Sequence, residues 1–351
     1  KGVMLTHKCL ISNIFQIKQI EPKSTLLFPV PFYHIYGMVI ALLTHTVQTS
    51  KLIFLSQFDL QRFLELIPQH KADRLYVVPP IILQLSKHPL VDKYDLSSVK
   101  TVLCAAAPLG TEVQDACANR LKCFVKQGWG MTELSPIASL TPELDHPLMV
   151  EHHLHGSCGL LSADTEGKIV DPVTGKDLPF TEEGELLVRG PQVMKGYLNN
   201  PEATAHTIRP DGWLHTGDIA VFNADGWLYI RDRLKELIKY KGFQVPPAEL
   251  EAIIASMAEV KDVVVIPVPD DEAGEVPRAY VVKQENCRAD FSADDVIEYV
   301  HSHVAPHKRL RGGVRFTDSI PKTASGKLLR RVQIERDRHI DASNTSQVEE
   351  S

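Results

Sequence analysis

The sequence predicts an α/β protein, and three changes of pattern along the chain support this fold class. Residues 1–150 alternate short apolar runs with amphipathic stretches, residues 151–234 are rich in turn signals, and residues 235–337 mix strand and helix patterns. Alternating strands and helices are typical of a parallel sheet covered by helices. We therefore expect a parallel α/β part, a small β-barrel-like part, a small α+β C-terminal domain, and a loose polar tail over residues 338–351.

Each part is predicted from its own local signals. In the first part, apolar runs predict strands at 25–30, 52–55, 75–78 and 99–104, and amphipathic stretches predict helices at 60–69, 81–87 and 112–121. In the second part, turn dipeptides such as Thr174-Gly175 and Asp225-Gly226 punctuate short strands. In the third part we expect strands at 263–267 and 279–282, a helix at 247–255 and a helix at 293–303 capped by Ser292.

Composition excludes several classes of protein. Of the 351 residues, 44% are hydrophobic and 23% are charged, which is ordinary for a globular chain. A net charge of -6 disfavours nucleic acid or an anionic membrane as the main partner. The six cysteines form no Cys-x-x-Cys pair, which argues against a disulfide framework and fits a reducing compartment. No apolar run reaches a membrane-spanning length and the last residues are not Ser-Lys-Leu, so we expect a cytoplasmic protein, with N-terminal targeting left open because the start is expected to be missing. We also expect a monomer.

Five motifs follow one another along the chain. They are KGVMLTH at 1–7, QGWGMTE at 127–133, DGWLHTGD at 211–218, RDRLKELIKYKG at 231–242 and PKTASGK at 321–327. Their order and spacing resemble the adenylate-forming superfamily of acyl-CoA synthetases, firefly luciferases and peptide-synthetase adenylation domains, with 4-coumarate–CoA ligase-like enzymes the most similar. The resemblance spans residues 1–331. It implies a carboxylic acid–CoA ligase that uses ATP, Mg²⁺ and CoA, forms acyl-AMP, and carries a mobile C-terminal lid domain.

Acyl-AMP formation brings a carboxylate against the α-phosphate of ATP, so catalysis needs cations aimed at the developing charge. Lys327 is the best candidate, because Gly326 lets the backbone approach closely and lysine is a flexible point charge. The resemblance implies that Lys327 bridges the carboxylate and the α-phosphate. A solvated basic loop is the alternative interpretation.

The nucleotide site is expected in the second and third motifs. Asp218 has two oxygens that suit the paired hydroxyls of ribose, and the resemblance makes Arg233 a second ribose contact. Gln127, Gly128 and Trp129 resemble the adenine-binding segment, with Trp129 in place of the tyrosine that most relatives carry. The alternatives are a turn carboxylate for Asp218 and a core aromatic for Trp129.

The phosphate-binding and mobile elements are assigned by resemblance. Thr132 is expected to contact phosphate, Glu133 to hold Mg²⁺, and Lys1 to close a phosphate-binding loop. The lysine-rich fourth motif supplies the hinge residue Lys235, the adenylate contacts Lys239 and Gln244, and the CoA contacts Lys241 and Gly242. An exposed helix face is the alternative for this lysine run.

The resemblance implies an acyl pocket around Tyr36, Ala105, Ala106 and Gly128, with His34 as its gate. A core histidine is the alternative for His34. The segment around Tyr36 offers no carboxylate to pair an ammonium group, which disfavours amino-acid substrates. Related ligases have Ser-Gly where this chain has Cys104-Ala105. An aromatic, 4-coumarate-like acid and a medium-chain fatty acid therefore both stay open.

Three alternatives remain. His152, His153 and His155 suggest a metal, but no partner is spaced to complete a site. A luciferase-like oxygenase would share the adenylation step. Because the chain begins at Lys1, we expect the rest of the phosphate loop and an upstream part of the large domain to be missing. This polypeptide alone would then be poorly stable and inactive. The third alternative is a truncated, non-catalytic product that only binds nucleotide or a partner.

Overall fold

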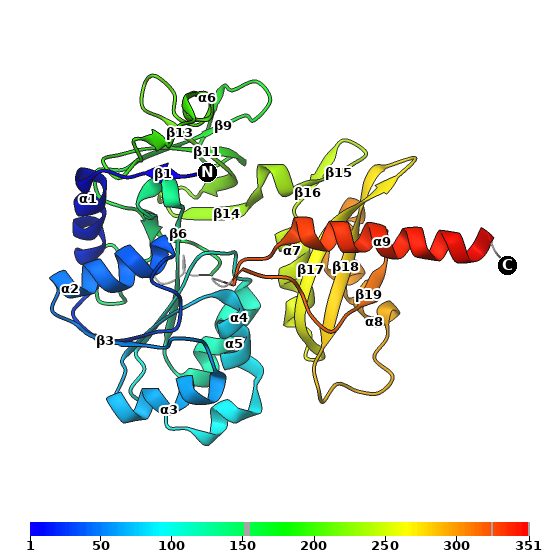
Figure 1. Cartoon of the computed structure of the whole chain (residues 1–351), viewed down its shortest axis with the longest axis horizontal. Coiled ribbons are helices and arrows are strands. Elements are labelled where there is room, and N and C mark those ends of the chain that lie inside the picture. The colour runs from blue at the N-terminus through cyan, green and yellow to red at the C-terminus, as the bar shows by residue number, and fades with distance from the viewer. Residues whose placement is uncertain (151–154, 324–325, 350–351) are drawn as a thin grey trace. The chain divides into compact units, whose positions relative to one another are not determined.

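The computed structural model describes residues 1–150, 155–323 and 326–349, with side chains as far as Asp341. The chain divides into two compact units, Lys1–Leu234 and Lys235–Ser351 (Figure 1). Among the described residues, no helix is both long and apolar enough to cross a membrane.

The first unit is built on a seven-stranded sheet in the order β3-β2-β4-β5-β6-β7-β8. Its strands are β2 (Thr25–Phe28), β3 (Lys51–Phe54), β4 (Arg74–Val77), β5 (Thr101–Cys104), β6 (Phe124–Gly130), β7 (Ile137–Leu140) and β8 (Leu160–Leu161). The pairs from β3 to β6 are parallel, and those of β6 with β7 and of β7 with β8 are antiparallel. The predicted parallel α/β part is confirmed.

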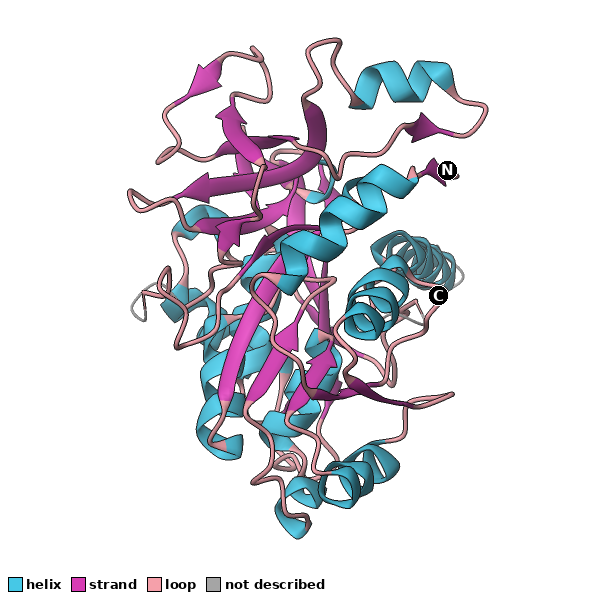
Figure 2. Cartoon of the chain, turned by 90° about the vertical axis from the view of Figure 1, so that its left-hand side faces the viewer, coloured by secondary structure: helices cyan, strands magenta, loops and turns pink. Residues whose placement is uncertain are grey.

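Helices connect these strands. They are α1 (His7–Lys18), η1 (Tyr36–Thr44), α2 (His45–Val47), α3 (Leu60–His70), α4 (Pro79–Lys87), η2 (Pro89–Lys93) and α5 (Thr111–Leu121). Of these, α1, α3 and η2 begin at side-chain caps. Asp59 caps α3 by accepting from the Arg62 amide at 2.8 Å. The π-helical η1 was not predicted from sequence. Figure 2 shows α1, the helix that follows the N label, lying across the strands, and α4 and α5 pack side by side.

The turn-rich region forms a five-stranded antiparallel sheet in the order β10-β9-β11-β13-β14. Its strands are β9 (Glu166–Val170), β10 (Asp177–Leu178), β11 (Gly184–Arg189), β13 (Leu214–Phe222) and β14 (Leu228–Arg233). The short helices η3 (Thr132–Leu134) and α6 (Pro201–Thr207) also belong to the first unit. β1 (Val3–Met4) pairs with β12 (Gly196–Tyr197), so the first residues of the chain lie beside residues almost 200 positions later.

The second unit is an α+β domain. Its strands are β15 (Ile238–Tyr240), β16 (Phe243–Val245), β17 (Val260–Asp270), β18 (Gly274–Lys283) and β19 (Val314–Phe316). Its helices are α7 (Pro247–Ser256), α8 (Ala293–His303), η6 (Pro306–Lys308) and α9 (Arg330–Glu349), preceded by η5 (Leu234–Glu236). The predicted Ser292 cap forms a reciprocal capping box with Asp295.

The structure differs from the sequence-based expectation after residue 337. The expected loose tail is helical as far as Glu349, as the end of α9. Two acidic side chains explain why this polar segment is held: Asp337 contacts Arg278 on β18 at 2.8 Å and Arg315 on β19 at 2.9 Å. Asp341 pairs with the same two arginines. These ion pairs come from distant parts of the chain, and composition gives no sign of them.

Candidate functional site

The adenine-type motif lies in β6, between β5 and β7. β6 pairs in parallel with β5 and antiparallel with β7. The motif's last glycine has a structural reason: a Cβ added to Gly130 would lie 2.0 Å from the carbonyl oxygen of Pro136. Any larger residue would separate the two strands, so Gly130 is required for close packing whether or not a ligand is bound.

Trp129 joins this motif to the third and fourth motifs. Its indole Nε1 donates a hydrogen bond to Asp218 Oδ2 at 2.9 Å. Asp218 on β13 is the cross-strand partner of Arg233 on β14, and Arg233 Nε lies 3.4 Å from Asp218 Oδ1. Three of the predicted nucleotide-binding side chains therefore form one cluster in which a carboxylate is held by an indole N–H and a guanidinium.

The burial of Trp129 favours the core interpretation of this residue. Its side chain is only 8% exposed and packs in a hydrophobic cluster with Leu134, Leu186 and Leu214. Little of the ring face is left open for a base. Its stacking role stays a prediction, whereas its hydrogen bond to Asp218 is a contact that the sequence alone did not reveal.

The backbone that leads to Asp218 is held by a buried glutamate. Gly217, with φ of +70°, donates its amide to Glu185 Oε1 at 3.2 Å. The ring nitrogen Nδ1 of His215 lies 3.0 Å from the other carboxylate oxygen of Glu185. The Asp218 amide also donates to Thr216 Oγ1 at 3.1 Å, so hydrogen bonds hold the backbone of the His-Thr-Gly-Asp segment of β13.

A second cluster links the first motif to Glu133. Lys1 Nζ lies 4.4 Å from the centre of the Tyr197 ring, and the Tyr197 hydroxyl donates to Glu133 Oε1 at 2.7 Å. Burial and this hydrogen bond raise the pKa of Tyr197 to about 12, so its proton stays in place at neutral pH. Sequence reasoning missed Tyr197, because only the pairing of β1 with β12 brings it to the site. Thr132 lies next to this cluster in the chain and is exposed.

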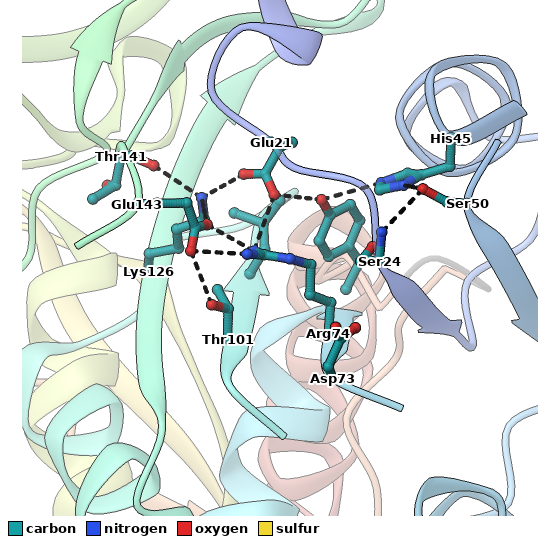
Figure 3. Close-up of polar contacts among 12 residues, drawn as sticks. Glu21, Ser24, His45, Ser50, Asp73, Arg74, Thr101, Lys126, Thr141 and Glu143 are labelled. Atoms are coloured by element: carbon teal, nitrogen blue, oxygen red, sulfur yellow. Dashed lines mark hydrogen bonds and ion pairs between the residues drawn. The ribbon is translucent and has the colours of Figure 1, made fainter. Parts of the chain in front are cut away.

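Buried charged side chains meet at Lys126, which lies on β6 (Figure 3). Lys126, which is fully buried, donates to Glu21, to Glu143 Oε1 at 2.6 Å and to the Thr141 carbonyl at 3.1 Å. Arg74 on β4 makes a bidentate contact with Glu143 at 2.7 and 3.0 Å. Two cations therefore meet two carboxylates, and the partners come from β4, β6 and the segments that follow α1 and β7. None of them was predicted.

Thr141 connects this charge network to the Gln127 carbonyl oxygen in the candidate site. Thr141 donates both its amide, at 3.1 Å, and its hydroxyl, at 2.9 Å, to the carbonyl oxygen of Gln127. Burial alone would raise the pKa of Glu143, but the Arg74 hydrogen bonds and the Lys126 charge outweigh it and lower the pKa to about 2. Glu143 is therefore ionised at neutral pH and keeps Lys126 and Arg74 in place beside the Gln127 segment.

The predicted acyl-pocket residues lie at the carboxyl ends of the parallel strands. Ala105 and Ala106 follow β5, and Gln127 is the β6 residue that pairs with Cys104 at the end of β5. Tyr36 follows β2, and its hydroxyl lies 3.5 Å from the carbonyl oxygens of Val77 and Leu103. In open parallel sheets, ligands bind outside this edge.

Two details of this edge refine the prediction. Tyr36 is only 3% exposed, and burial raises its pKa well above the ordinary value, so its hydroxyl stays neutral. Its contact with an acyl group stays a prediction. His34 accepts a hydrogen bond from the Tyr36 amide at 3.2 Å through Nδ1. Ala106 is exposed and has a φ of +77°, a left-handed conformation that is costly for alanine.

In the second unit, the fourth motif forms a hairpin instead of a helix. Lys239 on β15 is the cross-strand partner of Gln244 on β16. Lys241 and Gly242 form the two-residue turn between them, and both have positive φ, of 45° and 84°. Positive φ at both positions is typical of a type I′ turn, which glycine favours. The alternative interpretation of an exposed helix face is wrong, although these four residues are exposed as that interpretation expected.

Lys327 lies in a tight turn of the second unit. Its amide donates to Thr323 Oγ1 at 3.1 Å, and the Thr323 amide donates to the Lys327 carbonyl at 2.9 Å. Gly326 has a φ of +80°, which the turn requires. Lys322 and Leu328 form an isolated antiparallel bridge below this turn. The turn and the first-unit clusters belong to different units, and the approach of Lys327 to the nucleotide stays a prediction.

The histidine cluster and Glu133 differ as candidate metal sites. His152 and His153 lie outside the described residues, and His155 Nδ1 lies 3.2 Å from Asp115 Oδ1. Over residues 1–150, 155–323 and 326–349, no three His, Cys, Asp or Glu side chains are grouped to hold a metal. The half-buried Glu133 carboxylate fits Mg²⁺, which needs only one or two carboxylates when phosphates and water supply its other ligands.

Comparison with known proteins places the chain in a family. The model of the AMP-binding enzyme family matches residues 1–198, and the model of the AMP-binding enzyme C-terminal domain matches residues 249–327. The chain therefore belongs to the AMP-binding enzyme family, the class that its fold and motifs define.

Individual relatives agree with this assignment. The chain is 44% identical over 342 residues to 4-coumarate--CoA ligase 1 of Solanum tuberosum, with 94% of this chain and 61% of the relative covered. It is 42% identical over 338 residues to a probable 4-coumarate--CoA ligase 1 of Dictyostelium discoideum, covering 94% and 60%. Among solved structures, ATP-bound MatB from Rhodopseudomonas palustris matches with a TM-score of 0.85 and 29% identity, covering 97% and 66%. The chain thus spans about three fifths of the length of these curated relatives.

Proposed function

We propose that the intact protein that contains this chain is an ATP-dependent carboxylic acid–CoA ligase, which forms acyl-AMP and then acyl-CoA. One observation carries the proposal: Trp129, Asp218 and Arg233 come from separate motifs and meet in a single polar cluster. A carboxylate that is held in place and partly neutralised suits the two hydroxyls of a ribose. The similarity to curated 4-coumarate–CoA ligases supports the same conclusion.

In this proposal, each cluster of the first unit binds one part of the nucleotide. Gln127 and Gly128 contact adenine beside the buried Trp129, whose indole N–H holds Asp218, and Asp218 and Arg233 contact the ribose. Lys1 and Thr132 contact phosphate oxygens, and Glu133 would hold Mg²⁺, which would neutralise phosphate charge. The Tyr197 hydroxyl orients Glu133, since it donates to Oε1.

The second unit supplies the charge for the chemical step. When the acid carboxylate attacks the α-phosphate, negative charge grows on the phosphoryl oxygens, and the ammonium group of Lys327 stabilises it. Lys239 and Gln244, paired across one hairpin, contact the adenylate. Lys241 and Gly242, in the turn of that hairpin, contact CoA, and Lys235 is the hinge between the two half-reactions.

The acid is proposed to bind at the carboxyl edge of the parallel sheet, near Tyr36, Ala105, Ala106 and Gly128, with His34 as the gate. These residues carry no charge that would recognise an ammonium group. We therefore propose an aromatic, 4-coumarate-like acid or a medium-chain fatty acid.

The test is ATP–pyrophosphate exchange by the intact protein against cinnamic, benzoic and medium-chain fatty acids. We expect exchange with at least one of these acids, and CoA-dependent release of AMP with the same acid. Nucleotide binding without exchange for any acid would overturn the proposal and support a non-catalytic nucleotide-binding protein. Oxygen uptake with an added luciferin would instead support a luciferase-like oxygenase.

A further inference from the structure

A buried arginine lies three residues beyond Lys327. Arg330 is the first residue of α9 and is 9% exposed. Its guanidinium contacts Glu251 and the carbonyl oxygen of Val265, and its Nε lies 3.2 Å from Glu236 Oε2. The guanidinium therefore meets two carboxylates and one backbone carbonyl, each from a different segment of the second unit.

The three partners of Arg330 belong to the framework of that unit. Glu251 lies on α7 and also accepts a hydrogen bond from the Val265 amide of β17 at 2.8 Å. Glu236 lies in η5, directly after the proposed hinge residue Lys235. Arg330 thus ties the start of α9 to α7, to β17 and to the segment beside the hinge.

The other end of the Lys327 turn is tied in a similar way. Lys322 Nζ lies 2.6 Å from Asp262 Oδ2 on β17, and Lys322 forms an antiparallel bridge with Leu328. The turn that carries Lys327 is therefore held at its base by one lysine and one arginine. Of the two, only Arg330 also reaches the residue beside the hinge.

We infer that Arg330 is a positioning residue for Lys327, which couples the segment beside the hinge to the turn that delivers the catalytic ammonium group. The inference rests on the proposed function of Lys327. A flexible lysine stabilises a transition state only if its backbone is held in one place, since the ammonium must meet the phosphoryl oxygens within hydrogen-bonding distance. Because Glu236 adjoins Lys235, the ion pair transmits a change at the hinge to the Lys327 turn.

A purely structural role for Arg330 predicts a different result. If the ion pairs only stabilise the second unit, removing them should weaken both half-reactions equally. If they position Lys327, the loss should be confined to acyl-AMP formation, since thioester formation from acyl-AMP does not need Lys327 in this proposal.

The experiment compares Arg330→Met and Arg330→Lys with Arg331→Met in the intact protein. Arg331 is the matched control, because it is the next residue on the same helix and its side chain is 92% exposed. We expect Arg330→Met to lower the kcat of adenylation on the order of 10²-fold with KM for the acid little changed. Thioester formation from supplied acyl-AMP should stay within about twofold, Arg330→Lys should recover part of the adenylation, and Arg331→Met should match the unmodified protein.

The inference is overturned if Arg330→Met slows both half-reactions equally, or if it slows neither. Should Arg330→Met fail to fold, Glu236→Gln removes the negative charge beside the hinge and leaves the contacts of Arg330 with Glu251 and Val265 in place, and it should reduce adenylation in the same direction by a smaller factor. Unchanged adenylation in a folded Glu236→Gln variant would then overturn the coupling. Lys327→Ala, measured in parallel, separates the two proposals. Normal adenylation in Lys327→Ala rejects the proposed role of Lys327. If Lys327→Ala loses adenylation while Arg330→Met keeps it, only this inference is rejected.

Discussion

At the scale of single residues, the contacts of Asp218 decide how the candidate nucleotide site is built. Its carboxylate meets the indole N–H of Trp129 on one oxygen and the guanidinium of Arg233 on the other. Tyrosine, which the resemblance leads one to expect at position 129, has no N–H at the place of the indole nitrogen. The tryptophan therefore adds a hydrogen bond to Asp218 as well as filling the core.

Removing the indole N–H while keeping an aromatic ring should weaken ATP binding. Hydrogen bonds to charged groups contribute about 1.5–3 kcal/mol, so Trp129→Phe should raise the Kd for ATP by about tenfold or more. Calorimetric titration with MgATP measures this change. Trp213→Phe is a matched control, because Trp213 is 9% exposed, close to the 8% of Trp129. Equal affinities for all three proteins would contradict the role given to the Trp129–Asp218 contact.

Lys327 allows the most direct test of the chemical step. Lys327→Ala in the intact protein should lower acyl-AMP formation on the order of 10²–10³-fold, because a donor aimed at the developing charge is lost. Thioester formation from supplied acyl-AMP should persist. Single-turnover assays of the two half-reactions measure both effects, and equal loss of both would reject this division of labour.

At the scale of elements, the stability of β6 depends on the buried ion pairs that Lys126 makes. Lys126→Met would remove one of the two cations that Glu21 and Glu143 share and leave Arg74 to neutralise both buried carboxylates. Breaking a buried ion pair in this way costs about 3–5 kcal/mol, so the free energy of unfolding in urea should fall by that order. The exposed Lys100→Met is the control and should change the free energy by less than about 0.5 kcal/mol. An unchanged free energy of unfolding in Lys126→Met would show that the ion pairs of Lys126 do not stabilise the fold.

His45, at the start of α2, should make the first unit sensitive to mild acid. Burial lowers its pKa from 6.5 to about 4, despite the opposing charge of Glu21. Between pH 6.5 and 4 the unfolded chain therefore binds more protons than the folded one, and stability falls as the pH falls. One pKa unit corresponds to about 1.4 kcal/mol, so the loss should reach roughly 3 kcal/mol.

Urea unfolding at several pH values measures this dependence, and His45→Gln should flatten it in that window. The Glu143 carboxylate affects stability at lower pH. Its depressed pKa contributes stability that is present above about pH 4.5 and is lost as the pH falls towards 2. A slope between pH 6.5 and 4 that is unchanged in His45→Gln would assign the acid sensitivity to another group.

At the scale of the whole molecule, the second unit contains a hydrophobic core of its own. Its buried cluster includes Leu250, Ile254, Val265, Val281 and Val296, and all members of that cluster come from beyond residue 234. A unit with its own core is able to fold alone. Residues 235–349 expressed separately should therefore unfold cooperatively, with a free energy of roughly 5–15 kcal/mol in urea. A gradual, non-cooperative transition would show that the unit depends on the rest of the chain.

Much of the fold could be predicted because its signals are local. The runs that form β2, β4 and β5 are short and apolar, and Ser292 marks the start of α8 by the hydrogen bond that it makes there. The hairpin of Lys239–Gln244 was harder, since its charged residues are equally compatible with a helix face until the positive φ of Lys241 and Gly242 is known. α9 continues past residue 337 because distant arginines pair with its acidic residues.

By itself, the sequence determined the α/β fold class, several of the strands and helices, the family to which the chain belongs, and the motifs from which the candidate site is assembled. The tertiary structure alone decided which side chains meet: Tyr197 with Glu133, Lys126 with Glu21 and Glu143, and Arg330 with Glu236 and Glu251. The physical reason is that helix caps, turns and apolar periodicity act over a few neighbouring residues. A buried ion pair instead depends on burial and on partners brought together from far apart in the chain.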